Sequence, residues 1–177
     1  MRLADVPVGE DSPGIVNAVI EIPKGSSNKY EYNPALDAFV LDRALYSPLY
    51  YPTDYGWIAG TVSEDGDPLD ILVFTSHPTF PGCVVRARAI GVLHMHDEEG
   101  EDYEIIAAAS TDPRFNEVAG LEDLPEHVLR ETVHFFTVYK QLEYKETEIL
   151  GWLGIESAHR VITTAVERHE AGTSYQH

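Results

Sequence analysis

The stretch VVRARAIGVLHM, residues 84–95, is the clearest strand pattern in the chain. Its side chains alternate in character, and a period of two predicts a strand with one buried face. In this interpretation Arg86 and Arg88 point away from that face. The apolar face is expected to consist of Val85, Ala87, Ala89, Gly91, Leu93 and Met95. The stretch therefore predicts a fold that is built on a sheet.

Shorter strand patterns lie on both sides of this stretch. Residues 15–22 are rich in β-forming side chains and stop at Pro23, and residues 103–109 follow the long strand. Residues 29–32 and 39–43 also alternate. Turn residues separate these segments. The first two thirds of the chain thus predict a small, mostly antiparallel sheet or barrel.

The last third of the chain changes to a helical period. Apolar side chains recur every three or four residues after Pro125, and again over residues 155–169, which predicts two amphipathic helices. The expected apolar faces are Val128, Thr132, Phe135, Tyr139 and Leu142 in the first helix, and Ala158, Val161, Ile162, Ala165 and Val166 in the second. Because no repeat or low-complexity segment marks a boundary, we expect a single α+β domain over residues 1–177.

Composition limits the classes of function. The chain has 177 residues, 44% of them hydrophobic, which suits a domain with a packed core. Asp and Glu number 30 against 12 Lys and Arg, a formal charge of −18. This excess argues against nucleic acid and against an anionic membrane surface, because both attract Lys and Arg. A phosphorylated substrate would also be repelled unless a cation mediates its binding.

Targeting and redox features are few. The single cysteine, Cys83, excludes an intramolecular disulfide framework and a Cys-based zinc site. The first residues lack a basic segment that leads into an apolar one, so no signal peptide is expected. The most apolar stretch, residues 71–85, is interrupted by Pro78, Pro81 and Gly82 and is too short to span a bilayer. We expect a soluble, cytoplasmic protein.

The sharpest local feature is DGDPLD, residues 65–70. Its glycine and proline disfavour a regular helix, so Asp65, Asp67 and Asp70 are expected on one tight turn. Carboxylates this close raise one another's pKa, and a divalent cation such as Mg²⁺, Mn²⁺ or Ca²⁺ relieves the repulsion. For this fragment alone, a solvated acidic turn is the simpler interpretation. The spacing excludes an EF-hand, because Leu69 would occupy a ligand position.

A second acidic group, DEEGED at residues 97–102, follows the long strand. It is expected to form a hairpin connection with Asp97 and Asp102 at its ends. On its own, this loop is better explained by solvation than by metal binding. Two carboxylate-rich turns at strand ends are nevertheless what a multi-metal site requires. His94 and His96 lie beside the loop, but a zinc pair is less favoured than a surface or packing role, because oxygen donors outnumber them.

Scarce cations and several tyrosines form the third group of candidates. Phosphate binding needs positive charge and hydrogen-bond donors, which Arg supplies as a fork and Lys as a point charge. The candidates are Lys29, Arg43 and Lys140, with the tyrosines Tyr51, Tyr55 and Tyr139. The segment YPTDYG, residues 51–56, is bounded by Pro and Gly and is expected to be a loop at the rim of a site. The alternative for each tyrosine is a half-buried core aromatic.

These candidates occur in an order that resembles a known family. The segments are Glu21-Ile22-Pro23, Asn28-Lys29-Tyr30-Glu31, Leu41-Asp42-Arg43, residues 51–56, residues 65–70, Asp97-Glu98 with Asp102, and residues 134–140. Together they resemble the soluble family I inorganic pyrophosphatases of the short bacterial type, over residues 15–145. The DGDPxD pattern among them is highly specific for that family.

The resemblance implies a five-stranded, OB-like antiparallel β-barrel with two flanking C-terminal helices. It also implies hydrolysis of inorganic pyrophosphate to two phosphates with Mg²⁺, or Mn²⁺ in its place, by a homohexamer. The family's metal ligands correspond to Asp65, Asp70, Asp97 and Asp102, and the carboxylate that helps to deprotonate the nucleophilic water corresponds to Asp67. Its phosphate-binding residues correspond to Lys29, Arg43, Tyr55, Tyr139 and Lys140. Acids that support the ligands or hold an additional metal correspond to Glu21, Glu31 and Glu98, and a nearby hydrogen-bonding tyrosine corresponds to Tyr51.

Two segments depart from the family pattern. The family has a phosphate-binding lysine two residues after the aspartate that matches Asp102, and Glu104 occupies that position here. A later lysine-rich stretch is replaced by KETEI, residues 145–149. These changes bear on substrate affinity and on metal dependence. They keep two alternatives open: a related phosphoanhydride hydrolase with another substrate, and a non-catalytic metal- or phosphate-binding protein on the same scaffold.

Overall fold

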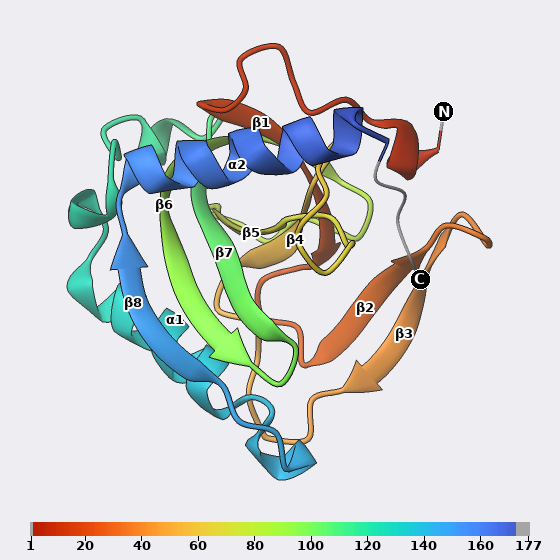
Figure 1. Cartoon of the computed structure of the whole chain (residues 1–177). Coiled ribbons are helices and arrows are strands. Elements are labelled where there is room, and N and C mark those ends of the chain that lie inside the picture. Colours follow the sequence, from red (N-terminus) through yellow and green to blue (C-terminus); the bar gives the residue numbers. More distant parts are fainter. Residues whose placement is uncertain (1, 173–177) are drawn as a thin grey trace.

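A computed structural model describes residues 2–172 of the chain, and Figure 1 shows their arrangement. The strands are β1 (Ile15–Ile22), β2 (Asn28–Asn33), β3 (Ala38–Ala44), β4 (Asp54–Ile58), β5 (Asp70–Phe74), β6 (Val84–Asp97), β7 (Gly100–Ala109) and β8 (Glu148–Leu153). The α-helices are α1 (Glu126–Val138) and α2 (Ile155–Glu170). Short 3₁₀ helices cover Leu3–Asp5, Pro113–Phe115, Leu121–Asp123 and Gln141–Glu143.

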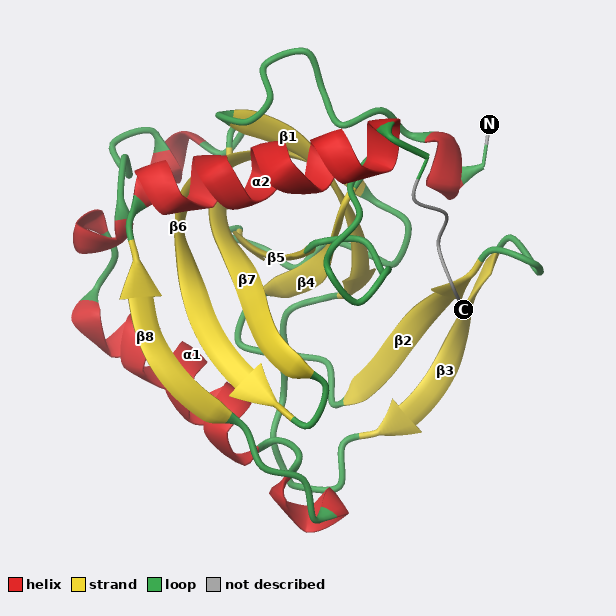
Figure 2. Ribbon diagram, in the orientation of Figure 1, coloured by secondary structure: helices red, strands yellow, loops and turns green. Residues whose placement is uncertain are grey.

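The main sheet closes on itself. β1, β4, β5, β7 and β6 are hydrogen-bonded in that order, and a further pairing of β1 with β6 completes the ring. β8 extends the sheet beyond β6, and β2 and β3 form a separate hairpin beside the ring, as Figure 2 shows. This ring of five strands confirms the expected OB-like fold. One pairing differs from the antiparallel prediction: β5 and β7 are parallel, because residues 75–83 carry the chain across the ring before β6 begins beside β1.

The two helices cover different parts of the sheet. α2 lies across β6 and β7 (Figure 1) and buries Ala158, Ile162 and Ala165 in the core of the ring, as the helical period predicted. α1 packs near β8 and buries Phe135 and Phe136 in a second core. Within residues 2–172, no helix is both long and apolar enough to cross a membrane.

The single apolar face predicted for residues 84–95 is wrong. The register between β6 and β7 shifts between Ala89 and Gly91, so Ile90 is an extra residue that forms a β-bulge. The core under α2 receives Val85, Ala87 and Ala89, whereas the core beside α1 receives Leu93 and Met95. Because the bulge reverses the alternation, one strand supplies side chains to two cores.

The first helix is shorter than its apolar pattern. α1 ends at Val138, Tyr139 is its C-terminal cap, and Leu142, which was expected on the apolar face, is 56% exposed. Residues 141–143 form a 3₁₀ helix that ends at Tyr144, a residue in the left-handed conformation. The chain turns at this point toward β8, a strand that the sequence pattern did not predict.

Two other strands also lie where loops were expected or where no element was assigned. Residues 51–56 were predicted to be a loop, but β4 already begins at Asp54 and therefore contains Tyr55. β5 begins at Asp70, so the acidic stretch 65–70 ends inside a strand. Both strands are short and buried on both faces, so they lack the alternation that identifies a half-buried strand.

Gly56 allows β4 to lie close against β1. It is paired with Ile20, and a Cβ atom at this position would lie 1.9 Å from the Val19 carbonyl oxygen. Strands inside a closed ring cannot move apart to make room. We expect Gly56→Ala to lower the free energy of unfolding by about 3 kcal/mol or more in urea melts. The control is Gly154→Ala, where an added Cβ meets no atom within 4 Å; equal, small effects in both variants would contradict the close approach.

Candidate active site

Three acidic side chains meet where β5 and β7 lie side by side. Asp70 is the first residue of β5, and Asp102 and Glu104 are two positions apart on β7, hence on one face of that strand. The parallel register of Ile71 with Ile105 brings Asp70 next to Glu104. One oxygen from each of the three carboxylates lies within 4.8 Å of the others. The pairing of β5 with β7 therefore builds a compact group of oxygen donors.

Desolvation and the charges of neighbouring acids raise the pKa of all three carboxyl groups. Desolvation is the largest cause at Asp70, followed by the charge of Asp102, and the pKa of Asp70 lies well above its ordinary value. Desolvation also raises the pKa of Glu104 far above the ordinary value, with the charges of Asp70 and Asp102 next. At Asp102, desolvation again leads the rise in pKa, and the charge of Asp97 follows. A divalent cation relieves such repulsion, and a donor set made only of oxygen fits a hard ion.

Asp65 and Asp67 lie on the exposed loop that precedes β5. The loop turns at the intervening glycine, whose φ is +96°, and the Asp67 amide donates to the Asp65 carboxylate at 2.9 Å. The prediction that these two residues share one turn with Asp70 is wrong for Asp70, which has already entered β5. After desolvation, the charge of Asp65 contributes to the raised pKa of Asp102, and that of Asp67 to the raised pKa of Glu21. The loop therefore lies near the carboxylates of the strands.

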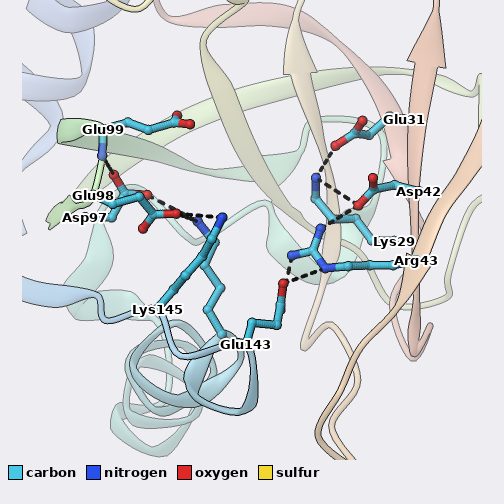
Figure 3. Close-up of polar contacts among 10 residues, drawn as sticks. Lys29, Glu31, Asp42, Arg43, Asp97, Glu98, Glu99, Glu143 and Lys145 are labelled. Carbon is cyan, nitrogen blue, oxygen red and sulfur yellow. Dashed lines mark hydrogen bonds and ion pairs between the residues drawn. The ribbon is translucent and has the colours of Figure 1, made fainter.

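The expected acidic hairpin is present and is tighter than its sequence suggested. Glu98 and Glu99 alone separate β6, which ends at Asp97, from β7. Asp97 Oδ2 lies 3.2 Å from Lys140 Nζ, and Glu98 Oε1 lies 2.9 Å from Lys145 Nζ, a contact visible in Figure 3. Desolvation raises the pKa of Asp97, but hydrogen bonds from the Glu99 amide and the Lys140 ammonium group outweigh it and hold the pKa below its ordinary value. Asp97 is therefore an ionised carboxylate.

The cations of the β2–β3 hairpin are held by carboxylates. Lys29 and Arg43 are paired across the two strands. Lys29 forms ion pairs with Glu31 and, at 3.9 Å, with Asp42. The Arg43 guanidinium contacts Asp42 and Glu143, with its Nε 3.0 Å from a Glu143 oxygen (Figure 3). Glu143 was not a sequence candidate, because no local pattern relates two residues that are 100 positions apart.

Three candidate tyrosines pack in the core beside α1 and border the carboxylates. Tyr51 is 2% exposed, and its ring centroid lies 5.5 Å from that of Tyr55 and 4.7 Å from that of Phe135. Tyr139 stacks on Phe135 at 5.1 Å. Desolvation is the largest cause of the raised pKa of each hydroxyl, and the charge of Glu104 adds to it at all three. The rings are therefore core aromatics, and their protonated hydroxyls are donors within electrostatic reach of the site.

Glu21 connects β1 to the β2–β3 hairpin. Its carboxylate accepts a hydrogen bond from the Tyr32 amide at 2.8 Å. Desolvation raises the pKa of Glu21 to about 7, the charges of Glu31 and Asp67 add to the rise, and Lys29 opposes it. The residues that affect this carboxyl group are other sequence candidates, so Glu21 lies within the same region.

The candidates share one region but do not all belong to one coordination group. Asp70, Asp102 and Glu104 are within ligand distance of one another, and that group does not include Asp65 or Asp97. Glu104 was noted in the sequence only as a departure from a family pattern. Its position two residues after Asp102 on a strand was the signal that could have placed it in the site.

His94 and His96, for which a zinc pair was the less favoured interpretation, have the environments of a packing residue and a surface residue. The His94 ring stacks on Tyr103 with centroids 4.5 Å apart, and His94 Nε2 lies 3.7 Å from a Glu101 oxygen. His96 is exposed. Both positions agree with the preferred interpretation of these histidines.

A family model described as inorganic pyrophosphatase matches residues 18–170. The chain belongs to the inorganic pyrophosphatase family. An inorganic pyrophosphatase of Geobacillus stearothermophilus is 52% identical over 155 residues, which are 88% of this chain and 94% of that protein. One of Thermus thermophilus is 43% identical over 172 residues, which are 96% of this chain and 98% of that protein. The crystal structure of an inorganic pyrophosphatase from Thermus thermophilus gives a TM-score of 0.94 at 42% identity and covers 96% of this chain and 99% of that chain.

The pyrophosphatase resemblance inferred from the motifs is thus confirmed for family and fold. The family match extends past residue 145, where the recognised motifs end, to residue 170, and therefore includes α2. Two of the three carboxylates in the group at β5 and β7, Asp70 and Asp102, belong to the acidic segments on which the resemblance was based.

The raised pKa of Glu21 predicts a pH-dependent loss of stability in this pyrophosphatase. A folded-state pKa of about 7 means that the folded protein keeps a proton that the unfolded chain has already released. The contribution of Glu21 to stability is therefore present below its unfolded pKa and is lost as the pH rises to about 7. Glu21→Gln removes this dependence. In urea melts with EDTA, we expect wild type to lose about 2 kcal/mol relative to the variant between pH 5 and pH 8.

The control for this measurement is Glu10→Gln, at an exposed position before β1. The free energy of unfolding of this variant should change with pH as that of wild type does. Parallel curves for Glu21→Gln and wild type would contradict the assigned environment of Glu21.

Proposed function

We propose that this chain hydrolyses inorganic pyrophosphate to two phosphate ions, with Mg²⁺ as the activating metal and Mn²⁺ as a substitute. The observation that carries the proposal is the group of carboxylate oxygens from β5 and β7, within 4.8 Å of one another, in a pyrophosphatase scaffold. Two cationic side chains act on this group through their charge: Lys29 of the β2–β3 hairpin lowers the pKa of Asp70, and Lys140, which follows α1, lowers that of Glu104. A polyanionic substrate can bind between metal ions and these cations although the chain carries a charge of −18.

The acids of the site are given distinct roles in this proposal. The metal ligands are Asp65, Asp70, Asp97 and Asp102. When bound, divalent cations neutralise phosphate oxygens, lower the pKa of a water molecule and stabilise the leaving phosphate. Asp67 accepts a proton from the attacking water. Its backbone amide is held by the Asp65 carboxylate at 2.9 Å, which orients Asp67 next to a ligand.

The substrate-binding groups are cations and neutral phenols. Lys29, Arg43 and Lys140 bind the phosphate groups, and Tyr55 and Tyr139 donate hydrogen bonds to them. Each of these cations has a carboxylate partner, so a phosphate group exchanges with that carboxylate when it binds. Tyr51 supports the two other tyrosines through ring contacts with Tyr55 and Phe135. Glu21, Glu31 and Glu98 support the ligands or hold an additional metal ion.

The alternatives left open by the sequence are not favoured. The relatives from Geobacillus and Thermus are named inorganic pyrophosphatase, and their similarity extends over most of both chains. Under either alternative, this chain would differ in activity from these two relatives. The alternatives are a hydrolase of another phosphoanhydride and a non-catalytic binding protein.

Asp67→Asn tests the proposed reaction. The carboxamide keeps the size of the side chain but cannot take up a proton, so we expect phosphate release from pyrophosphate with Mg²⁺ to fall by about 10² to 10⁴-fold. Wild type with EDTA should show no release. The matched control is Asp11→Asn, an exposed aspartate before β1, which should keep the wild-type rate. Folded wild-type protein without Mg²⁺-dependent release would refute the enzyme proposal.

We also propose that the chain assembles as a homohexamer in the cytoplasm. Large apolar side chains are exposed on the hairpin and the loops beside it, for example Leu36, Leu41 and Tyr46 at 66%, 58% and 60%. Such side chains are available for contacts between subunits. The single cysteine, Cys83, is free, which suits a reducing compartment. Light scattering should give six times the mass of the chain, and a monomer would refute the assembly.

A further inference from the structure

Glu104 is a buried acid without a complete set of partners. Its residue exposure is 2%, and its Oε2 atom makes no hydrogen bond with the rest of residues 2–172. A buried carboxylate oxygen without a partner is unfavourable unless a donor or a cation approaches it. The position of this oxygen shows where such a group belongs, because Asp70 and Asp102 each bring an oxygen to within 4.8 Å.

The basic side chains near this group have other partners. Lys140 lies 3.2 Å from Asp97 and 3.9 Å from Glu98. On the other side of the site, Lys29 is paired with Glu31. No ion pair among residues 2–172 connects a Lys or Arg to Glu104. The Tyr55 hydroxyl is a hydrogen-bond partner of Asp70 and Glu104, but it is neutral and carries no charge to offset three acids. A cation from solution supplies that charge at the one place that all three carboxylates face.

We propose that Glu104 is a metal ligand that, together with Asp70 and Asp102, binds one hard divalent cation. The inference rests on the proposed function, because it adds a ligand to the same region. It goes beyond that function, which gives Glu104 no role in binding a metal ion. Three oxygen donors on neighbouring strands hold one side of the ion. Its other coordination positions stay open to water or to phosphate oxygens, as Mg²⁺ prefers.

The closed ring explains why this site is preorganised. Asp102 and Glu104 leave the same face of β7, and the parallel register fixes Asp70 beside them. Little of the chain has to move when an ion binds, so metal affinity depends directly on the three side chains. Removing one of them is therefore expected to weaken the binding of one ion without unfolding the strand pair.

The test is a Mn²⁺ titration followed by the electron paramagnetic resonance signal of the free ion. It compares wild type, Glu104→Gln and Glu101→Gln; Glu101 is an exposed glutamate on the same strand. We expect Glu104→Gln to weaken the binding of one ion by at least about tenfold. Glu101→Gln should bind like wild type. Identical isotherms for all three proteins would overturn the assignment.

A second measurement needs no variant. Anomalous diffraction from wild-type crystals soaked in Mn²⁺ should place an ion within about 2.0–2.6 Å of a Glu104 oxygen. Ions bound only to the aspartates, with Glu104 outside coordination distance, would overturn the assignment. Phosphate release by wild type tests the proposed hydrolysis separately. An inactive wild type with Mn²⁺ on Glu104 would refute hydrolysis and still support Glu104 as a ligand.

Discussion

Repulsion among closely spaced and largely desolvated carboxylates is the constraint on which the site depends. The closed ring fixes the register of β5 and β7, so Asp70, Asp102 and Glu104 cannot separate by small movements. At such distances and with so little water, three negative charges need a counter-ion or a proton. A divalent metal supplies that charge and attracts phosphate at the same place. The geometry that makes the metal-free site unfavourable thus also favours the binding of a polyanion.

Much of the fold could be predicted from local sequence patterns, whereas the candidate site residues followed from the order of several motifs along the chain. Residues 15–22 coincide with β1, and the second helix begins at Ile155 as expected. The acidic hairpin connects two strands as expected, because charge and turn residues interrupt an alternating pattern there. The turn that carries Asp65 and Asp67 was recognised through its aspartates and its glycine, although Asp70 lies in β5 and not in the turn. Each of these features depends on residues that are close in sequence.

Features that depend on distant residues could not be predicted in the same way. The bulge at Ile90 divides β6 between two cores, and a continuous alternating pattern gives no sign of it. β4 and β5 are buried on both faces, so their period is absent. The neighbours of Glu104 depend on the parallel pairing of β5 with β7, and that pairing follows from the path of the connecting segment. These features follow from the pairing of residues that are distant in the sequence, and such pairing leaves no local pattern in a single sequence.

The ion pair between Arg43 and Glu143 has a consequence for how fast and how tightly an anion can bind. The guanidinium is already ordered and partly desolvated by a carboxylate from the segment after α1. The loss of side-chain entropy at Arg43 therefore occurs during folding and not during binding. In the proposed function, an incoming phosphate would exchange one anionic partner of Arg43 for another, so the charge around the guanidinium would change little. If Arg43 binds phosphate as proposed, Glu143 competes with every anion for the guanidinium, and a weakly charged anion would displace it less readily than a phosphate group would.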